Sequence, residues 1–207
     1  LINDRSGTPE DYGTPEQAVP TFPGKRGEHA PPLESRPWEA CMTMNDCWGY
    51  SAGDKNWKST REILHILIRC VSGGGNLLMN VGPKPDGTIP APSIKRLAEL
   101  GAWMDGNGES IYGCGPTETP AAGVGYFASS GTTTAKGRNL YFHILRWPGR
   151  ELCLKMGGFR VRSAQLLDGG RKLAVRREGE RVVLGGLPAR APDALAAVVK
   201  LTLASSG

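Results

Sequence analysis

The feature that most constrains the fold is a change of pattern near the middle of this 207-residue chain. In the first half, short apolar runs alternate with stretches of helical periodicity. Residues 38–44 and 76–81 predict strands, the second buried on both faces because nearly all its residues are apolar. Ser59 followed by Glu62 predicts a capped helix, and residues 91–105 predict a further helix. This alternation is typical of a parallel α/β unit.

Two details of the first half carry further expectations. Leu1 to Asn3 predicts the end of a strand, and the polar, Pro- and Gly-rich residues 6–37 predict a long loop. A loop of that length inside a compact domain is usually functional. In the second helix, apolar side chains recur on one face, namely Ile94, Leu97, Leu100 and Trp103. A fragment with three barrel strands is expected to leave an apolar helix face uncovered.

After about Tyr112 the periodicity becomes that of short strands. Turn residues such as Gly169-Gly170 and Gly185-Gly186 separate the apolar runs, which is typical of a small antiparallel β-sandwich. The runs predicted as strands are 124–128, 140–145, 151–155, 164–167, 172–176, 181–184 and 197–203.

Length then limits what the first half can be. A complete (β/α)₈ barrel needs about 250 residues, so we expect the C-terminal part of a (β/α)₈-like barrel over residues 1–112. A β-sandwich domain follows over residues 113–207, giving a fold class of α/β plus β. Because the chain starts without Met, inside the apolar pair Leu1-Ile2, we expect it to be a fragment whose natural N-terminus and any signal peptide lie upstream.

Composition excludes several classes of function. The sequence has no run of eighteen apolar residues, so we predict no membrane span. The net charge of +5 is interspersed with acids and lacks aromatic interleaving, which argues against nucleic-acid binding. Five cysteines without a CxxC pair and three scattered histidines predict no metal, no cofactor and mostly reduced, buried thiols.

Residues 36–50 are the part of the chain richest in functional side chains. Glu39 follows Trp38 directly, and a second aromatic pair, Trp48 and Tyr50, lies a few residues on. A sugar-cleaving pocket needs aromatic faces for the sugar and a carboxylic acid in apolar surroundings. The alternative is a core strand whose tryptophans serve packing. Asp46, between the aromatic residues, is interpreted as a loop or capping residue.

Several blocks of the sequence together resemble the alpha-L-fucosidases of glycoside hydrolase family 29. They appear in the order and at the spacing of that family, and the block at 11–17 most resembles the branch acting on alpha-1,3/4-linked fucose. The blocks are residues 1–5, 11–17, 38–44, 48–50, 73–83, 86–90, 101–103 and 107–113, with weaker matches at 140–142 and 147–148.

The resemblance implies a retaining mechanism with two carboxylates. Trp38-Glu39 matches a Trp-Glu pair of the family, so Glu39 is the candidate acid/base, with Glu16 of the long loop as the runner-up. Arg5 matches an arginine that contacts the sugar or the nucleophile, and Trp48 matches an aromatic residue lining the pocket. Arg5 also has a structural interpretation, an ion pair with Asp4 or a loop acid. The nucleophilic aspartate is expected upstream of residue 1.

The resemblance also implies a partner and a location. The expected substrate is a fucosylated oligosaccharide or glycoconjugate, and hydrolysis is expected to require the N-terminal half of the barrel. A secreted or periplasmic protein is expected, lysosomal in a eukaryote. The alternative function is a non-catalytic carbohydrate-binding or structural fragment, and the sequence of the upstream part would distinguish the two.

Overall fold

A computed structural model describes residues 1–3, 5, 7, 9–20, 36–117 and 131–204 of the chain. Its contacts divide the chain into two compact units, Leu1–Ala102 and Trp103–Gly207. The boundary between residues 112 and 113 inferred from the sequence lies later in the chain and stays a prediction. The predicted strand at 124–128 falls outside the described residues.

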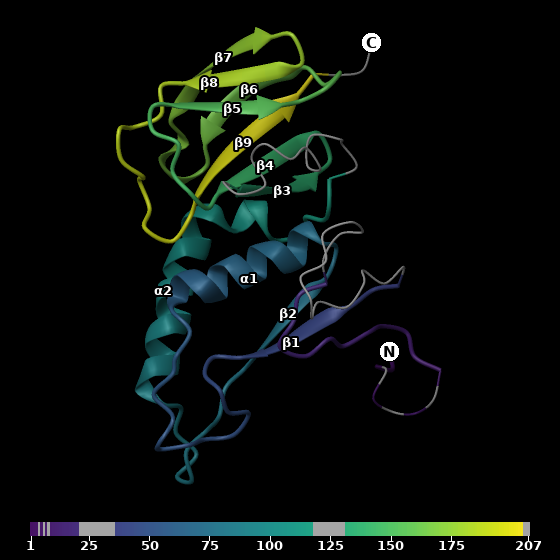
Figure 1. The fold of residues 1–207 in the computed structure, drawn as a ribbon, viewed down its shortest axis with the longest axis vertical. Coiled ribbons are helices and arrows are strands. Elements are labelled where there is room, and N and C mark those ends of the chain that lie inside the picture. Colours follow the sequence, from purple (N-terminus) through teal and green to yellow (C-terminus); the bar gives the residue numbers. More distant parts are fainter. Residues whose placement is uncertain (4, 6, 8, 21–35, 118–130, 205–207) are drawn as a thin grey trace. The chain divides into compact units, whose positions relative to one another are not determined.

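The first unit contains a parallel βαβ arrangement (Figure 1). Strand β1 (Glu39–Thr43) pairs in parallel with β2 (Asn76–Asn80), from Glu39 opposite Asn76 to Thr43 opposite Asn80. Helix α1 (Thr60–Ser72) connects them. Parallel neighbours require such a crossover because a tight turn can only join antiparallel strands.

Helix α1 begins and ends where local signals place it. The Ser59 side chain accepts from the backbone N–H of Glu62, and the Glu62 carboxylate accepts from the backbone N–H of Ser59, which completes a capping box. Gly73 ends the helix, and its N–H donates to the carbonyl of Arg69 at 3.0 Å. The apolar face of α1 is buried, with Leu64 and Ile68 fully inaccessible to solvent.

One burial prediction for the first unit is wrong. Strand β2 is not buried on both faces, since Leu78 is 50% exposed. Helix α2 (Ala91–Asn107) forms as predicted, and Ile94 and Leu97 on its apolar face are 55% and 44% exposed. Periodicity identifies an apolar face, whereas burial depends on what packs against it. The described residues cover these side chains only in part.

The predicted long loop contains a strand-like segment. Residues 12–17 run parallel to β1 and form single bridges between Gly13 and Trp38 and between Glu16 and Cys41. Tyr12 forms a further parallel bridge with Asn3. The segment therefore lies between the start of the chain and β1, and it holds the side chains of residues 14–17 beside that strand.

The second unit is built on one antiparallel sheet of seven strands, in the order β3-β4-β9-β6-β7-β8-β5 (Figure 1). The short helix η1 (Gly108–Ser110) precedes the sheet, and η2 (Asp168–Gly170) lies between β6 and β7. The strands are β3 (Gly131–Lys136), β4 (Asn139–Ile144), β5 (Glu151–Lys155), β6 (Val161–Leu166), β7 (Lys172–Glu178), β8 (Arg181–Gly185) and β9 (Ala197–Leu203).

This sheet folds around a single apolar core, as expected for a sandwich. Side chains from strands far apart in the sheet order share the core, among them Phe142, Leu152, Leu184 and Val199. Trp147 is partly buried and packs against the same cluster. Strand β3 was not predicted, because its run of threonines lacks the apolar residues by which the other strands were recognised.

Polar side chains of the second unit are held by specific contacts. The indole of Trp103 donates to the carbonyl of Ala196 at 2.7 Å. The hydroxyl of Tyr141 donates to Glu109 at 2.6 Å, and Lys200 pairs with the same carboxylate. These two partners lower the pKa of Glu109. Burial lowers the pKa of His143 to about 3, so this histidine is neutral.

No helix among the described residues has the length and apolar character that a membrane span requires. Groups of three or more side chains suited to a metal ion are also absent from the described parts of the chain. All five cysteines are free thiols, and burial is complete only for Cys70, so the expectation of mostly buried thiols is wrong.

Candidate active site

Strand β1 separates its side chains onto two faces. Ala40 and Met42 pack with Trp38 and with Cys70 of α1, so this face belongs to the core. Side chains alternate along a strand, and Glu39, Cys41 and Thr43 therefore point to the opposite face. In a (β/α)₈ barrel the face away from the helices is the barrel interior. The candidate functional residues of β1 thus lie on its inner face.

Arg5 and Glu16 form the central polar contact beside this face. The guanidinium of Arg5 pairs with the carboxylate of Glu16, and both side chains are 46% exposed. Arg5 is held in addition by Thr14, whose hydroxyl accepts from Nε at 2.9 Å and whose carbonyl accepts from Nη2 at 3.2 Å. Residues far apart in a long loop are thereby brought together at one point.

Cys41 shares the inner face of β1 with two candidate carboxylates. It sits opposite Glu16 in a parallel bridge, and Glu39 precedes it by two residues on the same face of the strand. Arg5 joins this group through its ion pair with Glu16. Burial raises the pKa of Cys41, the positive charge of Arg5 opposes this, and Glu16 and Glu39 raise the pKa further.

The two candidate carboxylates differ in their position along the strand. Glu39 is the first residue of β1, and its backbone N–H donates to the carbonyl of Gly13 at 2.9 Å. Glu16 lies opposite Cys41, closer to the carboxyl end of β1. In barrel enzymes the catalytic groups sit at the carboxyl ends of the strands, while the amino ends serve stability.

Gln17 is a functional candidate that the sequence analysis did not single out. Its side-chain amide donates to the hydroxyl of Thr43 at 2.8 Å, at the carboxyl end of β1. Its φ of 51° lies in the left-handed region, which costs energy for a residue other than glycine and is often found at functional sites. The position next to Glu16 in the 11–17 block was the available signal.

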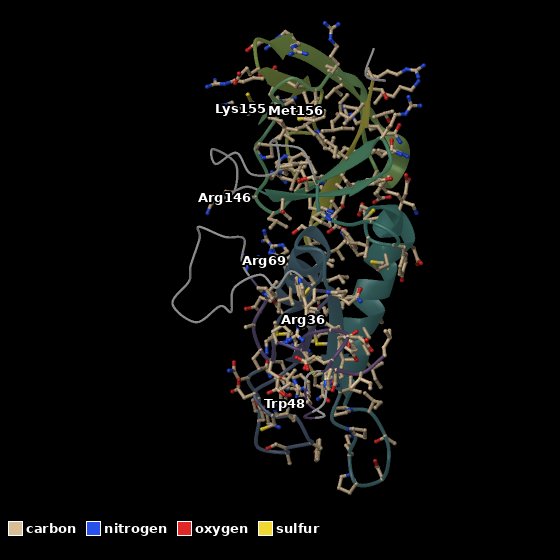
Figure 2. All side chains as sticks on the ribbon, turned by 90° about the vertical axis from the view of Figure 1, so that its right-hand side faces the viewer. Arg36, Trp48, Arg69, Arg146, Lys155 and Met156 are labelled. Atoms are coloured by element: carbon tan, nitrogen blue, oxygen red, sulfur yellow. The ribbon has the colours of Figure 1, made fainter. Side chains whose placement is uncertain are left out.

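Trp48 and Tyr50 lie just beyond the carboxyl end of β1. Trp48 is 41% exposed and is labelled in Figure 2. Its carbonyl accepts from the side-chain amide of Asn80, at the end of β2, at 2.6 Å. A half-exposed indole held at the strand ends can present a flat apolar surface to a sugar.

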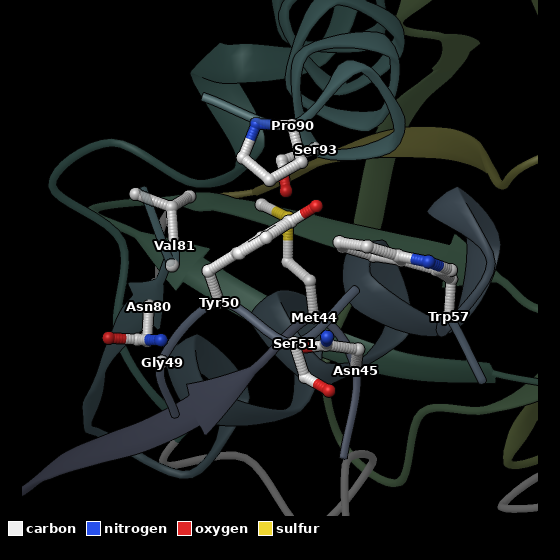
Figure 3. A pocket seen from close by; sticks show the side chains of 11 residues that line it. Met44, Asn45, Gly49, Tyr50, Ser51, Trp57, Asn80, Val81, Pro90 and Ser93 are labelled. Atoms are coloured by element: carbon white, nitrogen blue, oxygen red, sulfur yellow. The ribbon is translucent and has the colours of Figure 1, made fainter. Parts of the chain in front are cut away.

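A small hollow opens next to these aromatic residues (Figure 3). The side chains of Met44, Tyr50 and Trp57 surround it, and Pro90 and Ser93 at the start of α2 close another side. Its volume is about 10 Å³, room for roughly one water molecule. The hollow alone is thus too small to enclose a sugar ring.

Asp46 and Asp54 have structural roles in the loop after β1. The carboxylate of Asp54 accepts from the backbone N–H groups of Asp46 and Asn56, both at 2.9 Å. The amide of Asn56 in turn donates to the Asp46 carboxylate at 3.0 Å and 3.1 Å. Backbone hydrogen bonds, mainly from Asn56, lower the pKa of Asp54. These acids stabilise a turn, which agrees with the interpretation of Asp46 as a loop residue.

Comparison with known proteins places this arrangement in a family. The family model "Alpha-L-fucosidase" matches residues 1–109, which include β1, β2 and all the site residues described above. The chain belongs to the alpha-L-fucosidase family. The resemblance seen in the sequence blocks is therefore confirmed, although the branch within the family is not resolved.

Relatives of known sequence support this membership. Human plasma alpha-L-fucosidase is 38% identical over 118 residues, covering 54% of this chain and 24% of the human protein. Alpha-L-fucosidase of Dictyostelium discoideum is 33% identical over 118 residues, covering 56% and 25%. The chain thus spans about a quarter of the length of these curated relatives.

Solved structures extend the likeness to nearly the whole chain. Alpha-L-fucosidase isoenzyme 1 from Paenibacillus thiaminolyticus matches with a TM-score of 0.79 and 37% identity, over 94% of this chain and 45% of that one. The Thermotoga maritima alpha-fucosidase matches with a TM-score of 0.76 and 25% identity, over 97% and 44%. The chain therefore has the fold of the C-terminal part of the fucosidase barrel followed by a β-sandwich.

Proposed function

We propose that residues 1–207 form the C-terminal part of a retaining glycosidase that releases alpha-L-fucose from fucosylated glycans. The observation that carries the proposal is the contact between Arg5 and Glu16 beside the inner face of β1. Retaining glycosidases need a carboxylic acid and a nucleophilic carboxylate about 5–5.5 Å apart. The nucleophile is assigned to the part of the barrel outside residues 1–207.

Glu16 is the favoured acid/base, in preference to Glu39. Glu16 lies nearer the carboxyl end of β1, where barrel enzymes place their chemistry, whereas Glu39 begins the strand. The contact with Arg5 orients the Glu16 carboxylate, which activates water in the second step. Proton donation in the first step requires Arg5 to turn from Glu16 to the sugar, whose hydroxyls accept its paired N–H groups. Glu39 is assigned a structural role at the start of β1, where its backbone N–H donates to the carbonyl of Gly13.

Trp48 completes the proposed site. Its half-exposed indole offers an apolar face to the sugar at the strand ends, and Asn80 holds the backbone of that loop. The block at residues 11–17, which carries Glu16, supports a preference for alpha-1,3/4-linked fucose. The plasma protein among the relatives favours a secreted enzyme.

A second candidate function is a non-catalytic carbohydrate-binding fragment. The exposed aromatic side chains Trp48 and Tyr50 support it, because they offer sugar-stacking surfaces without requiring any chemistry. A catalytic aspartate encoded upstream in the complete reading frame would exclude this alternative.

The test compares carboxylate variants of the complete enzyme. Glu16→Gln should slow fucosides with poor leaving groups by about a hundred- to ten-thousand-fold, and activated aryl fucosides much less, since these need little protonation. Azide should partly restore turnover of the aryl substrate, because a small anion needs no general base. Glu10→Gln is the matched control, as Glu10 pairs with Arg36 instead.

Two outcomes would contradict the assignment. If Glu39→Gln shows the split between leaving groups and the azide rescue while Glu16→Gln does not, Glu39 is the acid/base. If the complete enzyme cleaves no fucoside, or releases fucose with inverted configuration in an NMR time course, the retaining fucosidase proposal fails.

A further inference from the structure

A second, larger hollow lies in the sandwich unit. It has a volume of about 290 Å³ and is lined by Arg160, Val161, Val175, Arg177 and Val182. Small-molecule sites usually measure about 300–1,000 Å³, so this hollow matches one substituted sugar ring better than an extended peptide. We call it the Arg160–Arg177 groove.

The groove exists because two neighbouring strands separate. Strands β6 and β7 pair only at Ala164 with Leu173 and at Gln165 with Lys172. Beyond these pairs β6 continues along β9 as far as Val161, while β7 continues along β8 as far as Glu178. The amino end of β6 and the carboxyl end of β7 therefore have no ladder between them, which leaves the edge of the core accessible.

The apolar wall of the groove is the edge of that core. Val182 is only 3% exposed and belongs to the core cluster, and Val161 packs against the same cluster. Val175, by contrast, is 36% exposed. A ligand in the groove would therefore meet mainly Val175 and Val161, while Val182 beneath them is nearly buried.

The two arginines supply positive charge to the groove. Among the described residues, no carboxylate pairs with Arg160 or Arg177, although the neighbouring Arg176 pairs with Glu178. Arg177 is anchored by the carbonyls of Gly179 at 3.0 Å and Gly157 at 3.4 Å. The backbone of Arg160 is fixed because its carbonyl accepts from Ala204 at 2.8 Å.

Positive charge is also concentrated in this half of the chain. Residues 103–207 contain 14 Lys and Arg against 8 Asp and Glu, a net charge of +6, whereas residues 1–102 contain 11 against 12, a net charge of −1. Figure 2 shows the blue nitrogen tips of basic side chains projecting from the strands of the sandwich. An anionic ligand is therefore attracted to this unit before it reaches the groove.

We infer that the Arg160–Arg177 groove is a non-catalytic binding site for a sulfated fucose residue of the glycan. Guanidinium groups bind oxyanions through paired N–H donors, which suits a sulfate ester. Fucose is a 6-deoxy sugar, and its methyl group suits the valine wall. This assignment of the ligand rests on the proposed fucosidase function. The site would hold a charged glycan on the enzyme between cleavage events.

The experiment measures binding of a sulfated fucose oligosaccharide to the complete enzyme by calorimetry. Its chemically desulfated form, inorganic sulfate, a sialylated oligosaccharide and an acidic peptide serve as comparison ligands. The variants are Arg160→Gln and Arg177→Gln, with Arg171→Gln as the control, because Arg171 is an exposed arginine outside the groove.

We expect the sulfated oligosaccharide to bind tightest and the desulfated form to lose most of its affinity. Each groove arginine variant should weaken binding roughly tenfold, as loss of a charged hydrogen bond does, while Arg171→Gln has little effect. Affinity should fall as salt rises. Hydrolysis of a neutral aryl fucoside and the melting temperature should stay unchanged in all of these variants.

Several results would overturn the inference. One is an affinity for the desulfated sugar, the sialylated sugar, the acidic peptide or inorganic sulfate that equals the affinity for the sulfated oligosaccharide. Another is a loss of affinity in Arg171→Gln as large as that in the groove variants. An enzyme that hydrolyses fucosides but does not bind the sulfated sugar contradicts this site alone. An enzyme that binds the sulfated sugar but hydrolyses no fucoside contradicts the proposed function alone.

Discussion

Gly75 is the position where the smallest substitution should have a large effect. A Cβ atom at Gly75 would lie 2.3 Å from Cδ2 and 2.4 Å from Cε2 and Cε3 of Trp38. Ordinary contacts between carbon atoms are about 3.5–4.0 Å, so Gly75→Ala requires the indole or the backbone to move by more than 1 Å. Gly75 directly precedes β2, and Trp38 directly precedes β1.

The surroundings of Trp38 leave little space for that movement. Trp38 is 3% exposed and packs with Ala40, Met42 and Cys70. The backbone at Gly73 also lies close to the ring, because a Cβ atom built on Gly73 would be 3.1 Å from Cζ2 of Trp38. Overpacking in a core costs about 1–3 kcal/mol, and a rigid ring places Gly75→Ala at the upper end, about 3 kcal/mol. That is a large part of a typical domain stability of about 5–15 kcal/mol.

Gly101→Ala is a matched control with the opposite expected sign. Gly101 lies inside α2, and a Cβ there would meet nothing within 4 Å. Alanine is favoured over glycine in a helix by about 0.5–1 kcal/mol, so this variant should be slightly more stable. Urea unfolding followed by circular dichroism compares the two variants with the parent protein. A free energy of unfolding for Gly75→Ala within about 0.5 kcal/mol of the parent would refute the packing argument.

Three further predictions concern the chain itself and the pH dependence of its stability. Residues 1–207 alone should not hydrolyse an aryl fucoside, because the nucleophile is assigned elsewhere; sustained turnover by the purified chain would contradict this. Burial lowers the pKa of His143 to about 3, whereas histidine in an unfolded chain has a pKa of about 6.5. The second unit should therefore lose stability as the pH falls from about 6.5 towards 3. His143→Gln should flatten this pH dependence of the melting temperature. Hydrogen bonds from Lys200 and Tyr141 lower the pKa of Glu109, so its contribution is present above about pH 4.3 and lost below it. Glu109→Gln should therefore lower the melting temperature at pH 7 more than at pH 3, and equal losses at both would count against the role of its charge.

Elements defined by neighbouring residues were predicted from the sequence. The capping box of Ser59 and Glu62 starts α1 where expected, and Gly73 ends it. Strands β5 and β9 have the predicted bounds. Such signals act through backbone hydrogen bonds and turns within a few residues, so they are present in the sequence whatever surrounds them. The family blocks likewise pointed to the enzyme class and to Arg5, Glu16, Glu39 and Trp48 as candidates.

Features that depend on distant partners were decided by the tertiary structure. The burial expected for Leu78 did not occur, because an apolar side chain is buried only where another surface covers it. The pairing of Glu16 with Arg5 depends on the parallel bridge between Glu16 and Cys41, two residues from different parts of the chain. Sequence spacing contains no information on such a bridge, because its register is set by non-local strand pairing. The sequence by itself thus determined the elements, the family and the set of candidate residues, and the tertiary structure decided which of them meet.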